Sequence, residues 1–190
     1  SFHIPQGELV FLMGPTGAGK STVLKTIYRD IPISDGVLFI NGEDVGKVHR
    51  RHIPKFRRKI GMVFQDYRLI PDRTVFENIA LPLQIDGVAK KNIKDKVYDI
   101  GEKVGLGKRI KNYPSQLSGG EKQRVSIARA LVKKPLVILA DEPTGNLDPN
   151  VSDEILDLLE IATDSGASVL MSTHNFPLIQ PRKKRFIELN

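Results

Sequence analysis

Apolar residues in this chain of 190 residues occur largely as short uninterrupted runs, such as the five residues at 136–140. Runs of this length are typical of strands buried on both faces of a parallel sheet. Segments with helical spacing lie between them, and this alternation predicts an α/β fold. The expected strands are 9–13, 37–40, 60–64, 136–140, 167–173 and 186–189, and the expected helices are 22–29, 74–80, 93–104, 122–132 and 151–162. Asn150 is expected to cap the last of these helices.

Two segments depart from the alternation. Residues 37–40 run into Asn41-Gly42, a strong hairpin signal that predicts a small antiparallel β part. Between 67 and 134 the pattern is helical throughout, which interrupts the alternation of strands and helices. We therefore expect one domain over residues 1–190, with a core at 1–66 and 135–190 and an inserted helical subdomain at 67–134.

The composition excludes several kinds of chemistry. The chain has no cysteine, so it contains no disulfide, thiolate metal site or cysteine nucleophile. Its hydrophobic fraction of 40% and charged fraction of 27% are ordinary for a globular domain. The longest apolar runs have about five residues, whereas a membrane-spanning helix needs ~20. We therefore expect any membrane contact to come through a partner or through surface charge.

The chain carries a net charge of +7, and its basic residues gather at 49–59 and at 182–185. Basic patches bind nucleic acid or anionic lipid headgroups in some proteins. More often such residues form a solvated surface, and we favour this interpretation.

The strongest chemical signal is a glycine-rich loop that directly follows the first expected strand. It fits the G-x-x-x-x-G-K-[ST] pattern, in which backbone amides surround a polyphosphate. Lys20 would reach the outer phosphates, the Ser21 hydroxyl would bind Mg²⁺, and the next helix would point its positive end at the anion. The alternative is a turn that binds nothing, but the flanking strand and helix favour a nucleotide site. The loop comprises Gly14, Pro15, Thr16, Gly17, Ala18, Gly19, Lys20, Ser21 and Thr22.

Polar side chains also follow three other expected strands: Gln65, the pair Asp141-Glu142, and His174. In an open parallel sheet, ligands bind at this carboxyl edge. Asp141 suits Mg²⁺ binding with Ser21 and Gln65, Glu142 suits polarisation of the attacking water, and His174 suits the γ-phosphate. By itself an acidic pair at a strand end is more often idle, and a lone histidine more often structural. The phosphate loop makes the functional interpretation the stronger one.

A second anion-binding arrangement precedes helix 122–132. Ser118, Gly119 and Gly120 supply a hydroxyl, close backbone approach and a helix N-terminus. Ser118 and Glu121 also match a capping box, so a plain helix cap is the alternative. One phosphate loop has no evident need for a second cradle within the same chain. In a two-fold dimer, however, each cradle can close over the partner's nucleotide, so we expect a homodimer.

These segments together resemble the ATP-binding cassette (ABC) ATPases over almost the whole chain. Residues 14–22 look like Walker A, 136–142 like Walker B, and 117–121 match the LSGGE signature letter for letter. Gln65 is similar to the Q-loop residue, Asp148 to the D-loop aspartate and His174 to the switch histidine.

The ABC resemblance implies a P-loop NTPase fold with a RecA-like core, and Mg²⁺-dependent ATP hydrolysis. Lys20, Glu142 and His174 would be the catalytic residues. Two ATP molecules would lie between the Walker A loop of one subunit and residues 118–120 of the other, with Asp148 nearby.

Residues 140–148 resemble a subgroup that contains lipoprotein-releasing, macrolide-export and cell-division ATPases, and 56–66 with 72–75 most resemble the cell-division member. That resemblance implies a subunit at the cytoplasmic face of the inner membrane, docked on an integral membrane protein through Phe76 and the 65–74 loop, without nucleic acid. An export ATPase is the alternative; a nucleic-acid-associated ATPase or a silent module fits less well. No residue matches the family's adenine-stacking aromatic, and Asn175 stands where an aspartate is common.

Overall fold

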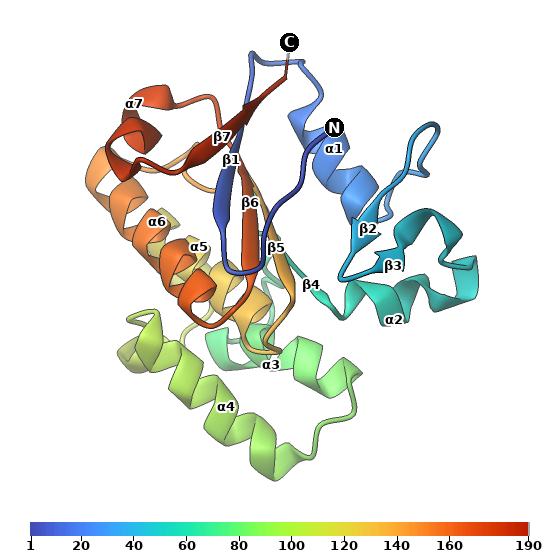
Figure 1. The fold of residues 1–190 in the computed structure, drawn as a ribbon. Coiled ribbons are helices and arrows are strands. Elements are labelled where there is room, and N and C mark those ends of the chain that lie inside the picture. The colour runs from blue at the N-terminus through green and yellow to red at the C-terminus, as the bar shows by residue number, and fades with distance from the viewer. Residues whose placement is uncertain (190) are drawn as a thin grey trace.

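The computed structural model describes residues 1–189 and is built around a five-stranded sheet (Figure 1). The strand order is β4-β5-β6-β1-β7, and every neighbouring pair is parallel. The expected α/β fold with a parallel core is therefore confirmed. The strands are β1 (Leu9–Met13), β4 (Ile60–Val63), β5 (Val137–Asp141), β6 (Ser168–Ser172) and β7 (Arg185–Glu188).

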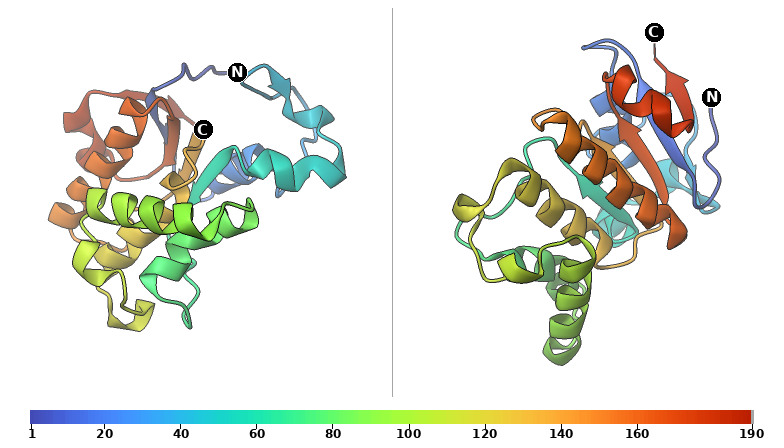
Figure 2. Two further views of the ribbon diagram at one scale, coloured as in Figure 1. Left: turned by 90° about the horizontal axis from the view of Figure 1, so that it is seen from below. Right: turned by 90° about the vertical axis from the view of Figure 1, so that its left-hand side faces the viewer.

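The sheet is covered on both faces, which explains its uninterrupted apolar strands. In β1, Leu9 and Phe11 join one buried cluster, whereas Val10 and Leu12 join another. Helices α5 (Gly119–Leu131) and α6 (Pro149–Asp164) contribute to the first cluster, and α1 (Lys20–Ile27) contributes to the second. Figure 2 shows these helices packed around the sheet. The side chains of β1, β5 and β6 therefore alternate between two cores, whereas β7 at the edge of the sheet is mostly exposed.

The expected antiparallel part is present as a short hairpin of β2 (Phe39–Ile40) and β3 (Glu43–Asp44). Asn41 and Gly42 form the turn with φ angles of 49° and 75°, as a two-residue hairpin with positive φ requires. The strand is shorter than the expected 37–40, and Val37 is 79% exposed. A helix that the pattern did not predict, α2 (Ile53–Arg57), follows within the first basic cluster and buries Phe56.

The helices α3 (Val75–Ile85) and α4 (Lys90–Lys103) lie below the sheet in Figure 1 and pack with α5. Thr74 and Glu77 form a capping box at the start of α3. Ser118 and Glu121 form another, so α5 begins at Gly119 rather than at the expected residue 122. The cap satisfies amides in the first turn and so extends the helix toward its N-terminus.

The expected cap of α6 was wrong by two residues. Asp148, not Asn150, is the N-cap, and its Oδ1 accepts a hydrogen bond from Val151 N at 3.1 Å. Pro149 explains the difference, because proline lacks an N–H and has the φ of a first helical residue. Asn150 therefore lies inside the first turn.

Much of the basic charge is paired within the chain. In the first cluster Arg57 pairs with Asp30 and Lys59 with Glu43. In the second, Arg182, just after α7 (Phe176–Ile179), contacts three acidic residues of α6, namely Asp153, Asp157 and Glu160. Within residues 1–189, no helix has the length and apolar character needed to cross a bilayer.

Candidate active site

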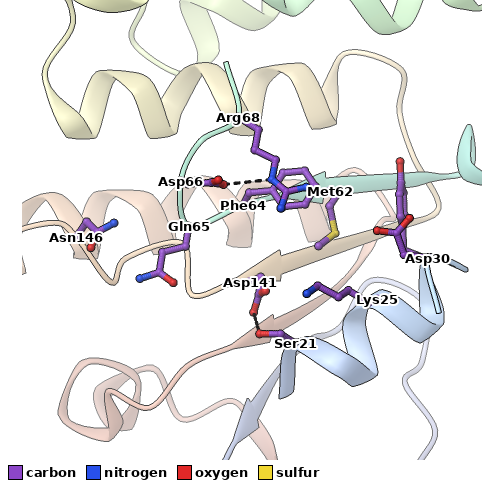
Figure 3. A pocket seen from close by; sticks show the side chains of 11 residues that line it. Ser21, Lys25, Asp30, Met62, Phe64, Gln65, Asp66, Arg68, Asp141 and Asn146 are labelled. Carbon is purple, nitrogen blue, oxygen red and sulfur yellow. Dashed lines mark hydrogen bonds and ion pairs between the residues drawn. The ribbon is translucent and has the colours of Figure 1, made fainter. Parts of the chain in front are cut away.

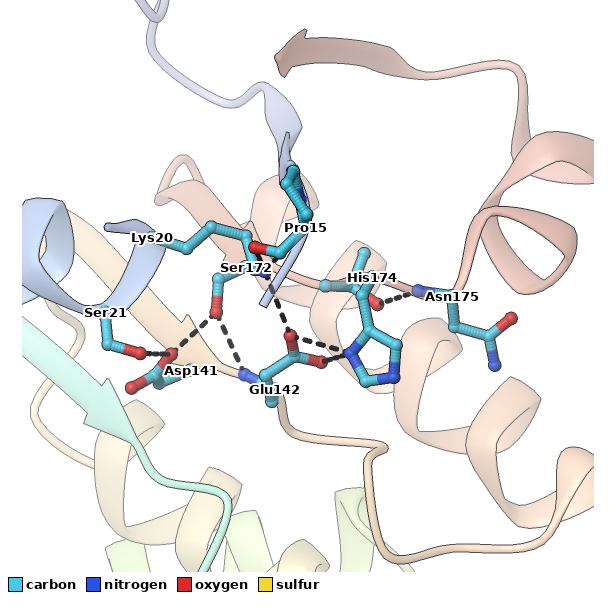
Figure 4. Close-up of polar contacts among 10 residues, drawn as sticks. Pro15, Lys20, Ser21, Asp141, Glu142, Ser172, His174 and Asn175 are labelled. Carbon is cyan, nitrogen blue, oxygen red and sulfur yellow. Dashed lines mark hydrogen bonds and ion pairs between the residues drawn. The ribbon is translucent and has the colours of Figure 1, made fainter. Parts of the chain in front are cut away.

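The sheet brings the four predicted polar segments to one edge. The phosphate loop follows β1, Gln65 follows β4, Asp141 ends β5, and His174 follows β6. Because all these strands are parallel, their carboxyl ends lie on the same side. At this edge Glu142 contacts both Lys20 and His174 (Figure 4).

The phosphate loop presents backbone amides at the start of α1. Gly19 caps this helix in the left-handed region, with φ of 93° and no side-chain hydrogen bond. The first helical bond is from Val23 N to Gly19 O, so the preceding amides form the donor-rich end of the helix. A Cβ on Gly17 would meet nothing within 4 Å, whereas one on Gly14 would lie 2.6 Å from Leu189 O. The loop is thus tightly packed where it leaves β1 and open where an anion would bind.

Lys20 joins the loop to the end of β5. Its Nζ donates hydrogen bonds to Gly14 O at 2.8 Å and Pro15 O at 3.1 Å. The same Nζ lies 3.7 Å from Glu142 Oε1, and the Lys20 side chain is only 8% exposed. A phosphate that enters the loop can therefore replace the two carbonyls as the partner of an ammonium group already held in the site.

Asp141 is held by two hydroxyls on its Oδ1 atom. Ser21 Oγ donates to it at 2.9 Å and Ser172 Oγ at 2.7 Å. Ser21 lies in the predicted phosphate loop, whereas Ser172 was not predicted as a site residue. A serine inside a predicted strand carries no motif; only the pairing of Asp141 with Ser172 across β5 and β6 could reveal its place.

Glu142 has a conformation that a non-glycine residue rarely adopts, with φ of 45°. Its amide donates to Ser172 Oγ at 3.1 Å, and both carboxylate oxygens lie 3.0 Å from His174 Nδ1. The glutamate side chain is 13% exposed and the histidine side chain 60%. Left-handed residues persist where surrounding contacts hold them, and they concentrate at active sites.

Gln65 lies beside an open cavity of about 330 Å³ that it shares with Ser21 and Asp141 (Figure 3). A hydroxyl, an amide and one carboxylate are oxygen donors that suit Mg²⁺, which binds few carboxylates and completes its shell with phosphate and water. Within the described part of the chain, no three His, Asp or Glu side chains form a metal cluster. The donor set therefore fits an ion that arrives with a phosphate ligand.

The structure does not bring Ser118, Gly119 and Gly120 to the phosphate loop. Among residues 1–189, no hydrogen bond or ion pair joins them to 14–22. A Cβ on Gly119 would lie 3.1 Å from the Tyr67 hydroxyl. The predicted cradle thus stands apart from the phosphate loop of its own chain, and the Asp148 carboxylate serves as the α6 cap.

Comparisons with known proteins identify the family of the chain. The family described as ABC transporter matches residues 1–145. The chain is 49% identical over 190 residues to the cell division ATP-binding protein FtsE of Escherichia coli K12, covering 100% of this chain and 86% of that protein. It is 47% identical over 189 residues to FtsE of Bacillus subtilis 168, covering 100% of this chain and 83% of that protein.

Solved structures show the same fold. One is a dimeric post-hydrolysis state of the ATP-binding cassette MJ0796 bound to ADP and Pi, with a TM-score of 0.87 and 35% identity, covering 100% of this chain and 84% of that one. Another is a dimeric structure of the same bacterial ABC transporter cassette, with a TM-score of 0.87 and 36% identity, covering 99% of this chain and 83% of that one.

Proposed function

We propose, because this chain belongs to the ABC transporter family of ATPases, that it is the ATP-hydrolysing subunit of an FtsE-type cell-division complex. In that role it would dimerise around ATP and drive a conformational change in an FtsX-like integral membrane protein that regulates peptidoglycan hydrolysis. It would act at the cytoplasmic face of the inner membrane, in contact with the membrane through this partner and without nucleic acid.

The contact of Lys20, Glu142 and His174 at the sheet edge is the observation that carries the mechanism. Loop amides and Lys20 hold the phosphates, while Glu142 accepts a proton from the attacking water. The water oxygen bonds to the γ-phosphorus as the bond to the ADP oxygen breaks. His174 Nδ1 contacts the Glu142 carboxylate and would hold it in place. The same imidazole would contact the γ-phosphate.

Mg²⁺, when bound, supplies charge neutralisation of the phosphate oxygens. Ser21, Gln65 and Asp141 are the residues that would hold it. The two hydroxyls on Asp141 Oδ1 orient the carboxylate before the ion arrives, which reduces the reorganisation that binding requires.

The separation of residues 118–120 from the phosphate loop supports a dimer in which each subunit completes the other's site. The dimeric state of both similar cassette structures supports the same arrangement. Asp148 would lie at this interface, where its carboxylate caps the N-terminus of α6. The helical subdomain, residues 67–134, would dock on the membrane partner through Phe76. The Phe76 ring packs at a tilt against Tyr98, with the ring centroids 5.9 Å apart.

Glu142→Gln tests the proposed mechanism. The amide cannot accept the proton, so we expect ATP turnover to fall by roughly 100-fold or more. ATP binding should persist, and the variant should elute as a dimer with ATP and as a monomer without it. The control is Glu154→Gln, a surface glutamate whose side chain is 57% exposed, which should keep the rate within about two-fold. Retained turnover in Glu142→Gln would exclude Glu142 as the general base.

The partner is tested by capture of ATP-loaded Glu142→Gln from detergent-solubilised membranes of the source organism. Recovery of a small membrane protein with few spans and one large extracytoplasmic domain supports the cell-division function. Recovery of a larger permease or lipoprotein-release complex moves the assignment to export, and recovery of nucleic acid alone contradicts a membrane partner.

A further inference from the structure

The segment that follows Gln65 contains two consecutive left-handed residues that are not glycine. Tyr67 has φ of 60° and Arg68 has φ of 46°. This conformation is strained for a residue that carries a Cβ, so it persists only where other contacts hold it. Both residues lie within three positions of the proposed metal-side glutamine.

Arg129 holds both residues through their backbone. From the last turn of α5, its Nη1 donates to Arg68 O at 2.6 Å and its Nη2 donates to Tyr67 O at 2.8 Å. A planar guanidinium presents N–H groups on two separate nitrogens in a fixed geometry, whereas a lysine ammonium donates from a single nitrogen. Burial lowers the pKa of Arg129, and no ion pair within residues 1–189 involves it. Its charge is therefore directed at the two carbonyls.

Other contacts tie the same segment to the site. The Arg68 guanidinium lies over the Phe64 ring at 4.0 Å and 3.4 Å from Asp66 Oδ1 (Figure 3). The Tyr67 hydroxyl lies against Gly119 in the first turn of α5, so the segment touches both ends of that helix. Gln65 itself stands beside Gly145, where a Cβ would lie 3.0 Å from Gln65 Nε2.

We propose that Arg129 is a positioning residue that clamps Tyr67 and Arg68 in the left-handed conformation and thereby sets the place of Gln65 in the active site. Without the clamp the two residues relax toward ordinary backbone angles, and Gln65 moves with them. The clamp also links Gln65 to α5, whose other end carries Ser118. This inference rests on the proposed role of Gln65 as a metal-side ligand.

The clamp itself is tested by amide hydrogen exchange in nucleotide-free protein. Arg129→Gln should raise exchange in residues 65–69 by roughly ten-fold or more, while the central strands keep their protection. Lys133→Gln is the matched control, because Lys133 follows the same helix, is partly buried and donates to Arg57 O at 3.0 Å. Arg129→Lys should give an intermediate increase. Equal exchange at 65–69 in Arg129→Gln and Lys133→Gln would overturn the clamp.

Action through Gln65 is tested by a double-mutant cycle. Arg129→Gln and Gln65→Ala should each lower kcat by roughly ten- to a hundred-fold and raise the Mg²⁺ concentration for half-maximal rate, with little change in KM for ATP. The double variant should lose no more than the worse single variant. Additive losses would overturn the proposal. If Arg129→Gln does not fold, Arg129→Lys replaces it in both experiments.

The positioning of Gln65 by Arg129 and the proposed ATPase mechanism can be rejected separately. An unchanged Mg²⁺ requirement in Gln65→Ala would reject the metal-side role of Gln65, and with it the positioning of that role by Arg129. The Glu142→Gln result would still judge the ATPase mechanism independently.

Discussion

The Ser172 hydroxyl serves both residues of the acidic pair at the end of β5. It donates to Asp141 Oδ1 and accepts from the amide of Glu142, whose φ of 45° requires such support. At the residue scale the site therefore depends on a side chain that lies outside every recognised motif. Lys20 has a comparable double use, because it binds loop carbonyls and Glu142 before any phosphate arrives.

Ser172→Ala should weaken the site without removing it. Loss of a net hydrogen bond to a charged group costs about 1.5–3 kcal/mol, so we expect a fall of roughly ten- to a hundred-fold in kcat/KM or in apparent Mg²⁺ affinity. Ser168→Ala, on the same strand, removes a bond to Pro5 O at the opposite end and serves as the control. A Ser172→Ala enzyme with the kinetics of the Ser168→Ala control would show that Asp141 needs no second hydroxyl.

At the scale of elements, the first turn of α5 is constrained by packing as well as by its cap. A Cβ on Gly120 would lie 2.6 Å from Val151 Cγ1 on α6. Packing against Val151 within one chain therefore favours glycine at this position, independently of any phosphate that the glycine faces in a dimer. Ser118 and Glu121 cap the same turn, so both capping and packing constrain its conformation.

Gly120→Ala tests this packing in nucleotide-free protein. Alanine favours a helix over glycine by about 0.5–1 kcal/mol, but the overpacked contact costs about 1–3 kcal/mol. We therefore expect a net fall in the free energy of unfolding, measured by urea denaturation. In a Val151→Ala background the same substitution should be neutral or stabilising. Equal destabilisation in both backgrounds would show that Val151 is not the obstacle.

The charge of Glu121 should make the α5 cap sensitive to pH. The hydrogen bond from the Ser118 amide, followed by that from Arg109, holds the pKa of Glu121 below its ordinary value. The carboxylate therefore stabilises the folded state above its unfolded pKa, and this stabilisation is lost as pH falls through the folded pKa. Glutamine can cap but carries no charge, so Glu121→Gln should unfold at a lower temperature than the wild type at pH 7.

The difference in unfolding temperature between Glu121→Gln and the wild type should shrink below about pH 5. Thermal unfolding followed by circular dichroism from pH 7 to about pH 3 measures this difference. If the difference in unfolding temperature stayed constant across that range, the charge of Glu121 would not contribute to stability.

At the scale of the whole molecule, strand order assembles the site. Ser21 and Asp141 are 120 residues apart in the chain, yet they share a hydrogen bond because α1 packs on β5. The placement of β6 between β5 and β1 brings Ser172 and His174 to the acidic pair. The cradle at residues 118–120 lies apart from the phosphate loop. Each monomer therefore carries the two halves of the proposed dimeric site, the phosphate loop and the cradle, in separate regions.

Local patterns in the sequence were sufficient for the fold class and for the place of the glycine-rich loop after β1. The phosphate loop, the hairpin at Asn41-Gly42 and the capping box at Ser118 depend on neighbours in the chain, so their signals are local. The strands were placed to within a few residues because burial on both faces leaves continuous apolar runs. The cap of α6 lies at Asp148 and not at Asn150 because Pro149 takes the first helical position, and this signal is also local.

Only the tertiary structure decided which residues meet. Three contacts join residues that are distant in sequence. They are the pairing of Asp141 with Ser172, the contact of Lys20 with Glu142, and the hydrogen bonds from Arg129 to Tyr67 O and Arg68 O. Periodicity tells which side of a strand or helix is buried, but it does not specify the neighbouring strand or its register. Strand register and helix packing are set when the apolar faces of all helices and strands are buried against one another. That condition is met only in the folded chain.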